Sequence, residues 1–263
     1  MNRFAGLLLL AIVTGCADQR QAAPSASDDP IASPSPSVGA SAVIDPAAAL
    51  ATVTCGGPPF PVELLSRQEE AQDADDPAAA ALRDLFTTPE GRTFLPRSGW
   101  TLAVRTATTA FYIADASPTA EAPFAHAEVE LRDGRWQMAG FGDCWPMVDV
   151  GPDLGLAEFV VDRGATLTPE TTHVPVLVTE RACTGAASSE DRIVAPAIIE
   201  SDASVIVVFA VVPLEGGVFT CPSNPATSLV LELPSPLGDR VLLDGSSVPP
   251  RDATVCARGG GCP

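Results

Sequence analysis

Six cysteines lie beyond position 50, and this even set constrains the fold more than any other feature of the sequence. They are Cys55, Cys144, Cys183, Cys221, Cys256 and Cys262. In an exported chain such a set predicts three disulfides, although the number alone leaves many pairings open. A zinc site is the alternative use, but no C-x-x-C occurs, and both histidines are far from any cysteine in sequence. We therefore expect disulfides and no metal.

The N-terminal residues have the pattern of an export signal. Arg3 supplies a positive charge, and residues 4–13 form an apolar run, about half the roughly 20 residues that a membrane-spanning helix needs. The run ends in Val13-Thr14-Gly15-Cys16, which resembles the lipobox of bacterial lipoproteins. The resemblance implies that residues 1–15 are removed and that Cys16 carries lipid at the extracytoplasmic face of the cell membrane. The alternative is an ordinary secretory signal.

Residues 16–50 are rich in Ala, Pro and Ser, a composition that cannot form a core, and we expect a disordered tether. The chain has no lysine. Without Arg3, 14 of its 15 basic residues remain against 33 acidic ones, a net charge of about −19. Such a surface repels nucleic acid and anionic lipid heads. We expect no nucleic-acid partner, and membrane contact through the lipid anchor only.

The pattern of residues 51–150 predicts a small α+β domain. After an extended, proline-rich lead-in at 55–61, Asp76 is a good N-cap and Pro77 suits the first position of a helix over 78–87. An antiparallel meander is expected next, with its helix lying across the apolar face. The four expected strands are 101–106, 109–114, 125–132 and 135–142. Asp133-Gly134 is typical of a type I′ turn between the last two, and their alternation predicts one buried and one wet face.

Residues 151–251 predict a second, all-β domain. Its expected strands are 156–162, 173–180, 193–199, 204–212, 227–233 and 239–243. Short strands at this spacing favour an immunoglobulin-like β-sandwich. Residues 205–212 are apolar throughout, which indicates a central strand covered on both faces. The strand order cannot be deduced from this pattern.

The two-domain division favours sequential disulfide pairing. Cys55 to Cys144 would close the first domain and Cys183 to Cys221 the second. Cys256 to Cys262 would close a short tail over 252–263, where three glycines give the loop the freedom it needs.

Several stretches resemble a recurring family of uncharacterised exported proteins from actinobacteria. They are Val178-Thr-Glu-Arg-Ala-Cys183-Thr-Gly, Cys221-Pro-Ser-Asn-Pro and Pro236-Leu-Gly-Asp-Arg-Val-Leu-Leu-Asp-Gly245. Gly134-Arg-Trp136 with Gly142-Asp-Cys144 resembles a segment that often precedes them. Together they cover most of residues 95–250. The resemblance implies a disulfide-stapled envelope protein, and it transfers no catalytic residue because the family has no assigned activity.

Known catalytic and cofactor motifs are missing from the sequence. There is no G-x-S-x-G, H-E-x-x-H, phosphate-binding loop or dinucleotide fingerprint. The acids Asp73, Asp75 and Asp76 lack the glycine and closing glutamate of a calcium loop, and they suit a solvated helix entry. We therefore expect no cofactor and nominate no catalytic residue from a motif.

One constellation is open to a catalytic interpretation. His126, Glu128 and Glu130 alternate along the strand at 125–132, so they project from one face, where carboxylates beside a histidine could act as general acid and base. The competing interpretation is the wet face of a half-exposed sheet.

The aromatic residues of the first domain have two interpretations as well. They are Trp100, Tyr112, Phe124, Trp136, Phe141 and Trp145. They could line a ligand or partner cleft rimmed by acids, or they could supply the core of a small domain that is otherwise rich in alanine.

The sequence thus favours an envelope-anchored lipoprotein that is a non-catalytic binding or structural module for an envelope protein or small ligand. The alternative is an envelope hydrolase that uses carboxylates on the strand at 125–132.

Replacing Cys16 tests the anchor. The Cys16→Ser chain should leave the membrane fraction, because stable anchoring needs more than one acyl chain and the substitution removes their attachment point. Fractionation and fatty-acid labelling measure this. The lipid assignment is wrong if the variant stays membrane-bound and the unsubstituted chain takes up no label.

Overall fold

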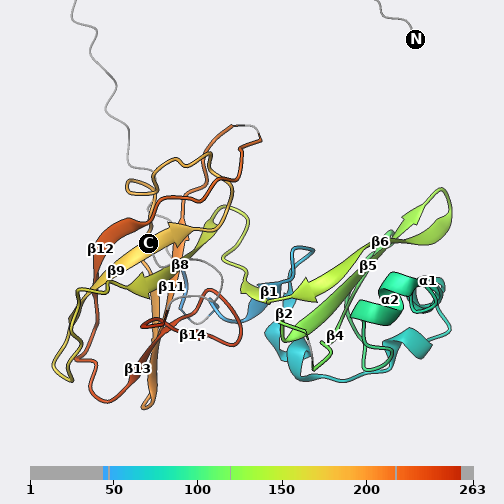
Figure 1. Ribbon diagram of the computed structural model, residues 1–263, viewed down its shortest axis with the longest axis horizontal. Helices are drawn as coiled ribbons and strands as arrows, with labels where there is room; N and C mark the ends of the chain where they lie inside the picture. The colour runs from blue at the N-terminus through green and yellow to red at the C-terminus, as the bar shows by residue number, and fades with distance from the viewer. Residues whose placement is uncertain (1–43, 47, 119, 217, 256–263) are drawn as a thin grey trace, which may run out of the picture. The chain divides into compact units, whose positions relative to one another are not determined.

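The computed structural model describes residues 44–46, 48–118, 120–216 and 218–255. Over these residues the chain is mainly β: a small α+β part is followed by a larger sheet, as the sequence predicted (Figure 1). All of them belong to one compact unit. The domain division near residue 150 stays a prediction, and the signal, Cys16 and residues 16–43 lie outside the described part.

The last residues of the predicted tether are already folded. Ile44 and Ala49 are buried in a cluster with Val148, Val208 and Ala210. The Ala49 N–H donates to the Asp45 carbonyl at 2.9 Å. The folded chain therefore includes Ile44, ahead of the predicted boundary at residue 50.

Helix α1 (Pro77–Leu85) has the N-terminus that the sequence predicted. The carboxylate of Asp76 accepts the Ala78 N–H at 2.7 Å, and Pro77 occupies the first turn, where its missing N–H costs nothing. The helix buries Leu82 and Leu85. It contacts β5 (Phe124–Arg132) and β6 (Arg135–Cys144), so it covers the apolar face of the meander as predicted.

The structure adds short helical segments that the sequence analysis did not identify. Helix α2 (Pro89–Phe94) begins at Thr88, whose hydroxyl accepts the Gly91 N–H at 3.0 Å. Thr88-Pro89 repeats the cap-and-proline signal of α1, so this helix could have been found. Two 3₁₀ helices, η1 (Val62–Ser66) and η2 (Ala71–Asp73), precede α1.

The predicted meander forms as a sheet in the order β3-β4-β5-β6, with β3 spanning Thr101–Arg105 and β4 Thr109–Asp115. At the β5–β6 turn, Asp133 and Gly134 have φ of 51° and 73°, the two positive angles that a type I′ turn requires. Between this sheet and α1 lies a core that includes Leu82, Trp100 and Tyr112. The Trp100 indole is fully buried and donates to the Pro96 carbonyl at 3.0 Å.

The opposite face of the meander is not wet throughout, which corrects the prediction. Phe111 and Ile113 on β4 are buried in a cluster with Val53 and Phe60. The reason is that the proline-rich lead-in folds back onto this face of the meander. A Cβ at Gly57 would lie 2.5 Å from the Phe111 ring, so only glycine fits where the lead-in crosses it.

Three short strands hold this lead-in in place. Strand β1 (Thr52–Thr54) pairs antiparallel with both β2 (Phe60–Pro61) and β7 (Met147–Val148). The disulfide Cys55–Cys144, with Cα atoms 5.3 Å apart, joins the end of β1 to the end of β6.

All six predicted strands of the second part are present, together with one more at its end. Within the described residues they form a sheet in the order β12-β9-β8-β11-β13-β14, with β10 also paired to β11. Their bounds are β8 Gly155–Val161, β9 His173–Glu180, β10 Ala197–Glu200, β11 Ser204–Val211, β12 Thr227–Glu232, β13 Val241–Asp244 and β14 Arg251–Asp252.

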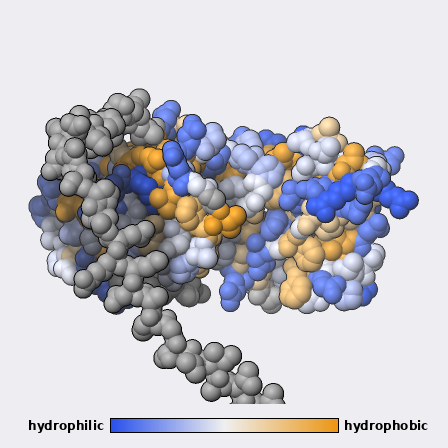
Figure 2. All heavy atoms as spheres, turned by 90° about the horizontal axis from the view of Figure 1, so that it is seen from above, coloured by the Kyte–Doolittle hydropathy of each residue, from blue (hydrophilic) through white to orange (hydrophobic). Residues whose placement is uncertain are grey.

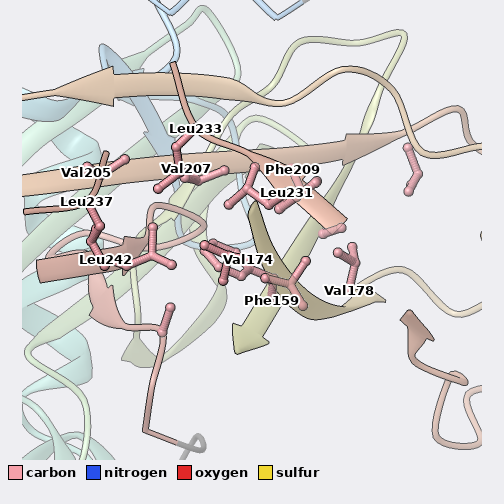
Figure 3. Close-up of a cluster of buried hydrophobic side chains, with 14 residues drawn as sticks. Phe159, Val174, Val178, Val205, Val207, Phe209, Leu231, Leu233, Leu237 and Leu242 are labelled. Carbon is pink, nitrogen blue, oxygen red and sulfur yellow. The ribbon is translucent and has the colours of Figure 1, made fainter. Parts of the chain in front are cut away.

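Strand β11 is central, as its apolar run predicted. Its first half pairs antiparallel with β10 and parallel with β13, and its last residues pair with β8. Val205, Val207 and Phe209 enter a core shared with β8, β9, β12 and β13, whose side chains converge in Figure 3. Val208 and Ala210 enter a second cluster. Both faces are therefore covered, as in the core strand of a sandwich.

The second disulfide also agrees with the sequential pairing. Cys183 and Cys221 are bonded, with Cα atoms 4.6 Å apart. Cys256 and Cys262 lie outside the described residues, so their pairing stays a prediction.

Truncating Leu82 tests the core under α1. Leu82→Ala should lower the free energy of unfolding by about 2 to 5 kcal/mol, since the side chain is fully buried and a cavity remains. Val230→Ala is the control, because Val230 is 57% exposed and should change stability by about 0.5 kcal/mol or less. Urea denaturation measures both. Equal losses in the two variants would contradict the assigned core.

Candidate functional site

His126, Glu128 and Glu130 project from one face of β5, as the sequence predicted. Their neighbours Ala125, Ala127 and Val129 are buried on the other face. On β4 the residues opposite the three are Ile113, Phe111 and Thr109. The surroundings of this face therefore change along the strand. Near His126 the face is covered by the apolar cluster around Phe111, and near Glu130 it is open to solvent.

His126 lies in the apolar end of this face. Its ring stacks on Phe111 with centroids 5.7 Å apart and an interplanar angle of 13°. Its Nδ1 is buried and has no hydrogen-bond partner among the described residues. Burial lowers the pKa of His126, while the Asp143 backbone and the Glu128 and Asp143 carboxylates oppose that shift. The imidazole is therefore neutral near pH 7.

The two glutamates have different surroundings. Glu130 accepts from Arg132 at 2.6 Å and 2.8 Å, so it is committed to a surface ion pair. Glu128 has no side-chain hydrogen bond or ion pair within the described part, although its charge acts on His126. Opposite it on β6 is Gly140, where a Cβ would meet nothing within 4 Å. A two-carboxylate site is thus reduced to one half-buried, uncommitted carboxylate on β5, which is paired on both sides.

The aromatic residues mostly build the core, which was one of the two interpretations. Trp100 and Tyr112 are buried beneath α1, and Trp136 and Phe141 pack against them. Burial, with a smaller contribution from Asp76, raises the pKa of Tyr112 to about 12, so this phenol is protonated at any physiological pH. Of the three tryptophans only Trp145, at 53%, is exposed. The aromatics therefore do not line a common cleft.

An ionic cluster around the buried Asp244 in the second part was not identified from the sequence. The Arg251 guanidinium donates to Asp244 at 2.5 Å, to Glu158 at 2.9 Å and to the Ser246 hydroxyl at 3.2 Å. Glu158 also pairs with Arg181 at 2.7 Å. The cluster joins β8, β13 and β14, which are apart in sequence, so no local motif could have revealed it.

Within this cluster Asp244 is held by several donors. The Ser246 N–H and hydroxyl donate to it at 3.0 Å and 2.8 Å. Burial raises the pKa of Asp244, and Arg251 only partly offsets that shift. Activation of a serine requires a free base, whereas this carboxylate is occupied by Arg251. The arrangement therefore braces the strands and does not resemble a nucleophile site.

A second buried pair anchors the segment around the Cys183–Cys221 disulfide. Glu180 on β9 is bonded to Arg192, which also donates to the Val212 carbonyl at 2.7 Å. The Asn224 amide donates to the Glu180 and Ala182 carbonyls at 2.7 Å and 2.6 Å. These bonds fix the backbone of the neighbouring loops. The Glu180 carboxylate is occupied by Arg192 and is not free for chemistry.

The remaining surface offers no other candidate of this kind. On the face seen in Figure 2, hydrophobic residues lie in groups among hydrophilic ones. Among the described residues no group of histidine, cysteine and carboxylate side chains could hold a metal ion. No helix in that part of the chain is long and apolar enough to cross a membrane.

The buried imidazole predicts a specific pH dependence. The folded-state pKa of His126 is below its ordinary value of about 6.5. As the pH falls, the imidazole is therefore protonated in the unfolded chain before it is protonated in the folded one. The free energy of unfolding should decrease as pH drops below about 6.5, by up to about 1.4 kcal/mol per pH unit. Urea midpoints between pH 7.5 and 5.5 measure the slope.

Two substitutions test whether His126 is the group that causes this slope. His126→Leu should flatten the slope, whereas His173→Gln should leave it unchanged because His173 is exposed. If the two variants keep the same slope as the unsubstituted chain, the imidazole is not the group responsible.

The comparisons with known proteins do not assign the chain to a family. No family model, curated protein or solved structure matches it.

Proposed function

We propose that this protein is an envelope lipoprotein, anchored through Cys16, whose folded part is a non-catalytic binding or structural module outside the cytoplasm. Two disulfides in the described part support an oxidising environment. The lipobox resemblance and the apolar run before it support the anchor. The resemblance to exported actinobacterial proteins is in keeping with the same location.

The observation that carries the non-catalytic proposal is the commitment of the nominated side chains. Glu130 is bonded to Arg132, and His126 is stacked on Phe111. General acid–base chemistry needs two groups poised around a substrate in a concave site. A sheet face with one uncommitted carboxylate suits a surface that is recognised by a partner.

The charge of the protein limits the class of partner. A net charge of −18 for the whole chain disfavours nucleic acid and anionic lipid surfaces. Partners with a neutral or basic surface fit best, either an envelope protein or a small ligand.

A hydrolase remains the second candidate because of one specific observation. Glu128 is uncommitted, and the unpartnered Nδ1 of His126 is on the same strand face. In that alternative Glu128 is the acid or base.

One experiment separates the two. The Cys16→Ser chain is used both to capture partners from envelope extract and in a panel of hydrolase substrates. We expect a captured partner that binds the purified chain again, and no turnover. Turnover that disappears in Glu128→Gln and persists in Glu232→Gln, an exposed carboxylate on β12, would replace the binding module with the hydrolase.

A further inference from the structure

We propose that strand β6 (Arg135–Cys144) is a self-association surface. Two copies of the chain pair antiparallel along β6 about a two-fold axis, so that the meander sheet continues from one copy into the other. The occupant of this edge is a second copy of the same chain. The inference is independent of the proposed function.

The first observation is that β6 is a long edge strand. It is the last strand of the order β3-β4-β5-β6 and, within the described part of the chain, it pairs with β5 alone. Of its ten residues only Cys144 is buried. The tip of the β5–β6 hairpin stands clear of α1 and α2 in Figure 1. Folded proteins normally shield an edge of this length, because its free N–H and C=O groups can pair with another strand.

The other edges among the described strands are better protected. Beside β3, the Ala71 N–H donates to the Trp100 carbonyl at 2.8 Å, and the Thr101 hydroxyl donates to the Arg67 carbonyl at 3.0 Å. Strand β12 has six residues, with Pro225 before it and Pro234 after it. Short strands flanked by proline are poor templates for pairing.

The second observation is a bulge that makes the outer edge of β6 self-complementary. Glu128 lies opposite Gly140 and Val129 opposite Met138, so Ala139 is the extra residue. In a two-residue hairpin the two residues that flank the turn form a hydrogen-bonded pair. From there along β6, the backbone N–H and C=O groups of successive residues point alternately inward, toward β5, and outward, away from it.

This alternation gives the outward positions of β6. Before the bulge, the backbone groups of Trp136 and Met138 point outward. Beyond the bulge the alternation shifts by one residue, so the backbone groups of Phe141 and Asp143 point outward. These four positions are symmetric about the point between Ala139 and Gly140, as a two-fold antiparallel pair requires.

The third observation concerns the side chains that this register brings together. Met138 lies opposite Phe141 of the second copy, and both are half-buried members of the cluster beneath α1. Trp136 lies opposite Asp143 of the second copy. The Arg105 guanidinium stacks on Trp136, 4.2 Å from its ring centroid, and is already paired with Asp76 at 3.0 Å, so the Asp143 carboxylate approaches a guanidinium that it would share with Asp76. The gain from pairing is therefore mainly the apolar surface that Met138 and Phe141 bury.

The net charge of the chain adds a dependence on salt. Two strongly acidic copies repel each other at long range, and salt screens that repulsion. Dimerisation should therefore strengthen as sodium chloride is raised.

Sedimentation equilibrium of the Cys16→Ser chain tests the proposal. We expect a monomer–dimer equilibrium and about tenfold or more weakening in Met138→Asp, which places a carboxylate against Phe141 of the second copy. Val230→Asp is the matched control, since Val230 is exposed on β12, and it should dimerise like the unsubstituted chain. Circular dichroism confirms that each variant is folded.

If Met138→Asp does not fold, amide hydrogen exchange gives the same answer without a substitution. The amides of Met138 and Phe141 should become protected as the protein concentration rises, and those of β12 should not. A chain that stays monomeric at about 100 μM in high salt overturns the proposal, as does a dimer that Met138→Asp leaves intact. Capture of a different protein through β6 by a monomeric chain would also overturn it.

Discussion

The pairing of β1 with β2 on one side and β7 on the other holds distant parts of this structure together. It places Val53 and Phe60 against Phe111 and Ile113, so that this part of the second face of the meander is a core and not a wet surface. The chain next to β7 continues the connection, because the Val148 N–H donates to the Ser246 carbonyl at 3.0 Å. Ser246 lies two residues after the end of β13, so β1 is linked through β7 to the larger sheet.

The environment of His126 is a consequence of this pairing. Without the folded-back lead-in, the strand face around Phe111 would be open to water and the imidazole would keep its ordinary ionisation. With it, the ring lies against an apolar cluster and the charged form loses hydration. A residue that looks catalytic by its neighbours in sequence is thereby half-buried against an apolar cluster.

Electrostatics have a structural role in so acidic a chain. Buried or half-buried arginines are shared among several acceptors: Arg251 bonds Asp244 and Glu158, and Arg192 bonds Glu180 and loop carbonyls. A buried carboxylate is tolerated only when such donors replace its lost hydration. The arginines thus join strands, and the acids that remain on the surface define which partners can approach.

The local elements were readable from the sequence because each depends on residues close together in the chain. Asp76 and Pro77 mark the start of α1, Asp133-Gly134 marks the β5–β6 turn, and the unbroken apolar run of β11 marks a strand covered on both faces. The first two disulfides followed from the order of the cysteines and the expected strands.

Contacts between residues far apart in the chain were decided by the tertiary structure alone. The parallel pairing of β11 with β13, the folding back of residues 51–61 onto Phe111 and the cluster of Asp244 with Arg251 and Glu158 have no local signal. The same is true of the candidate site, since alternation placed His126, Glu128 and Glu130 on one face but could not show what covers it. The physical reason is that periodicity reports which side of a strand a residue occupies, whereas burial, ionisation and reactivity depend on what packs against that side.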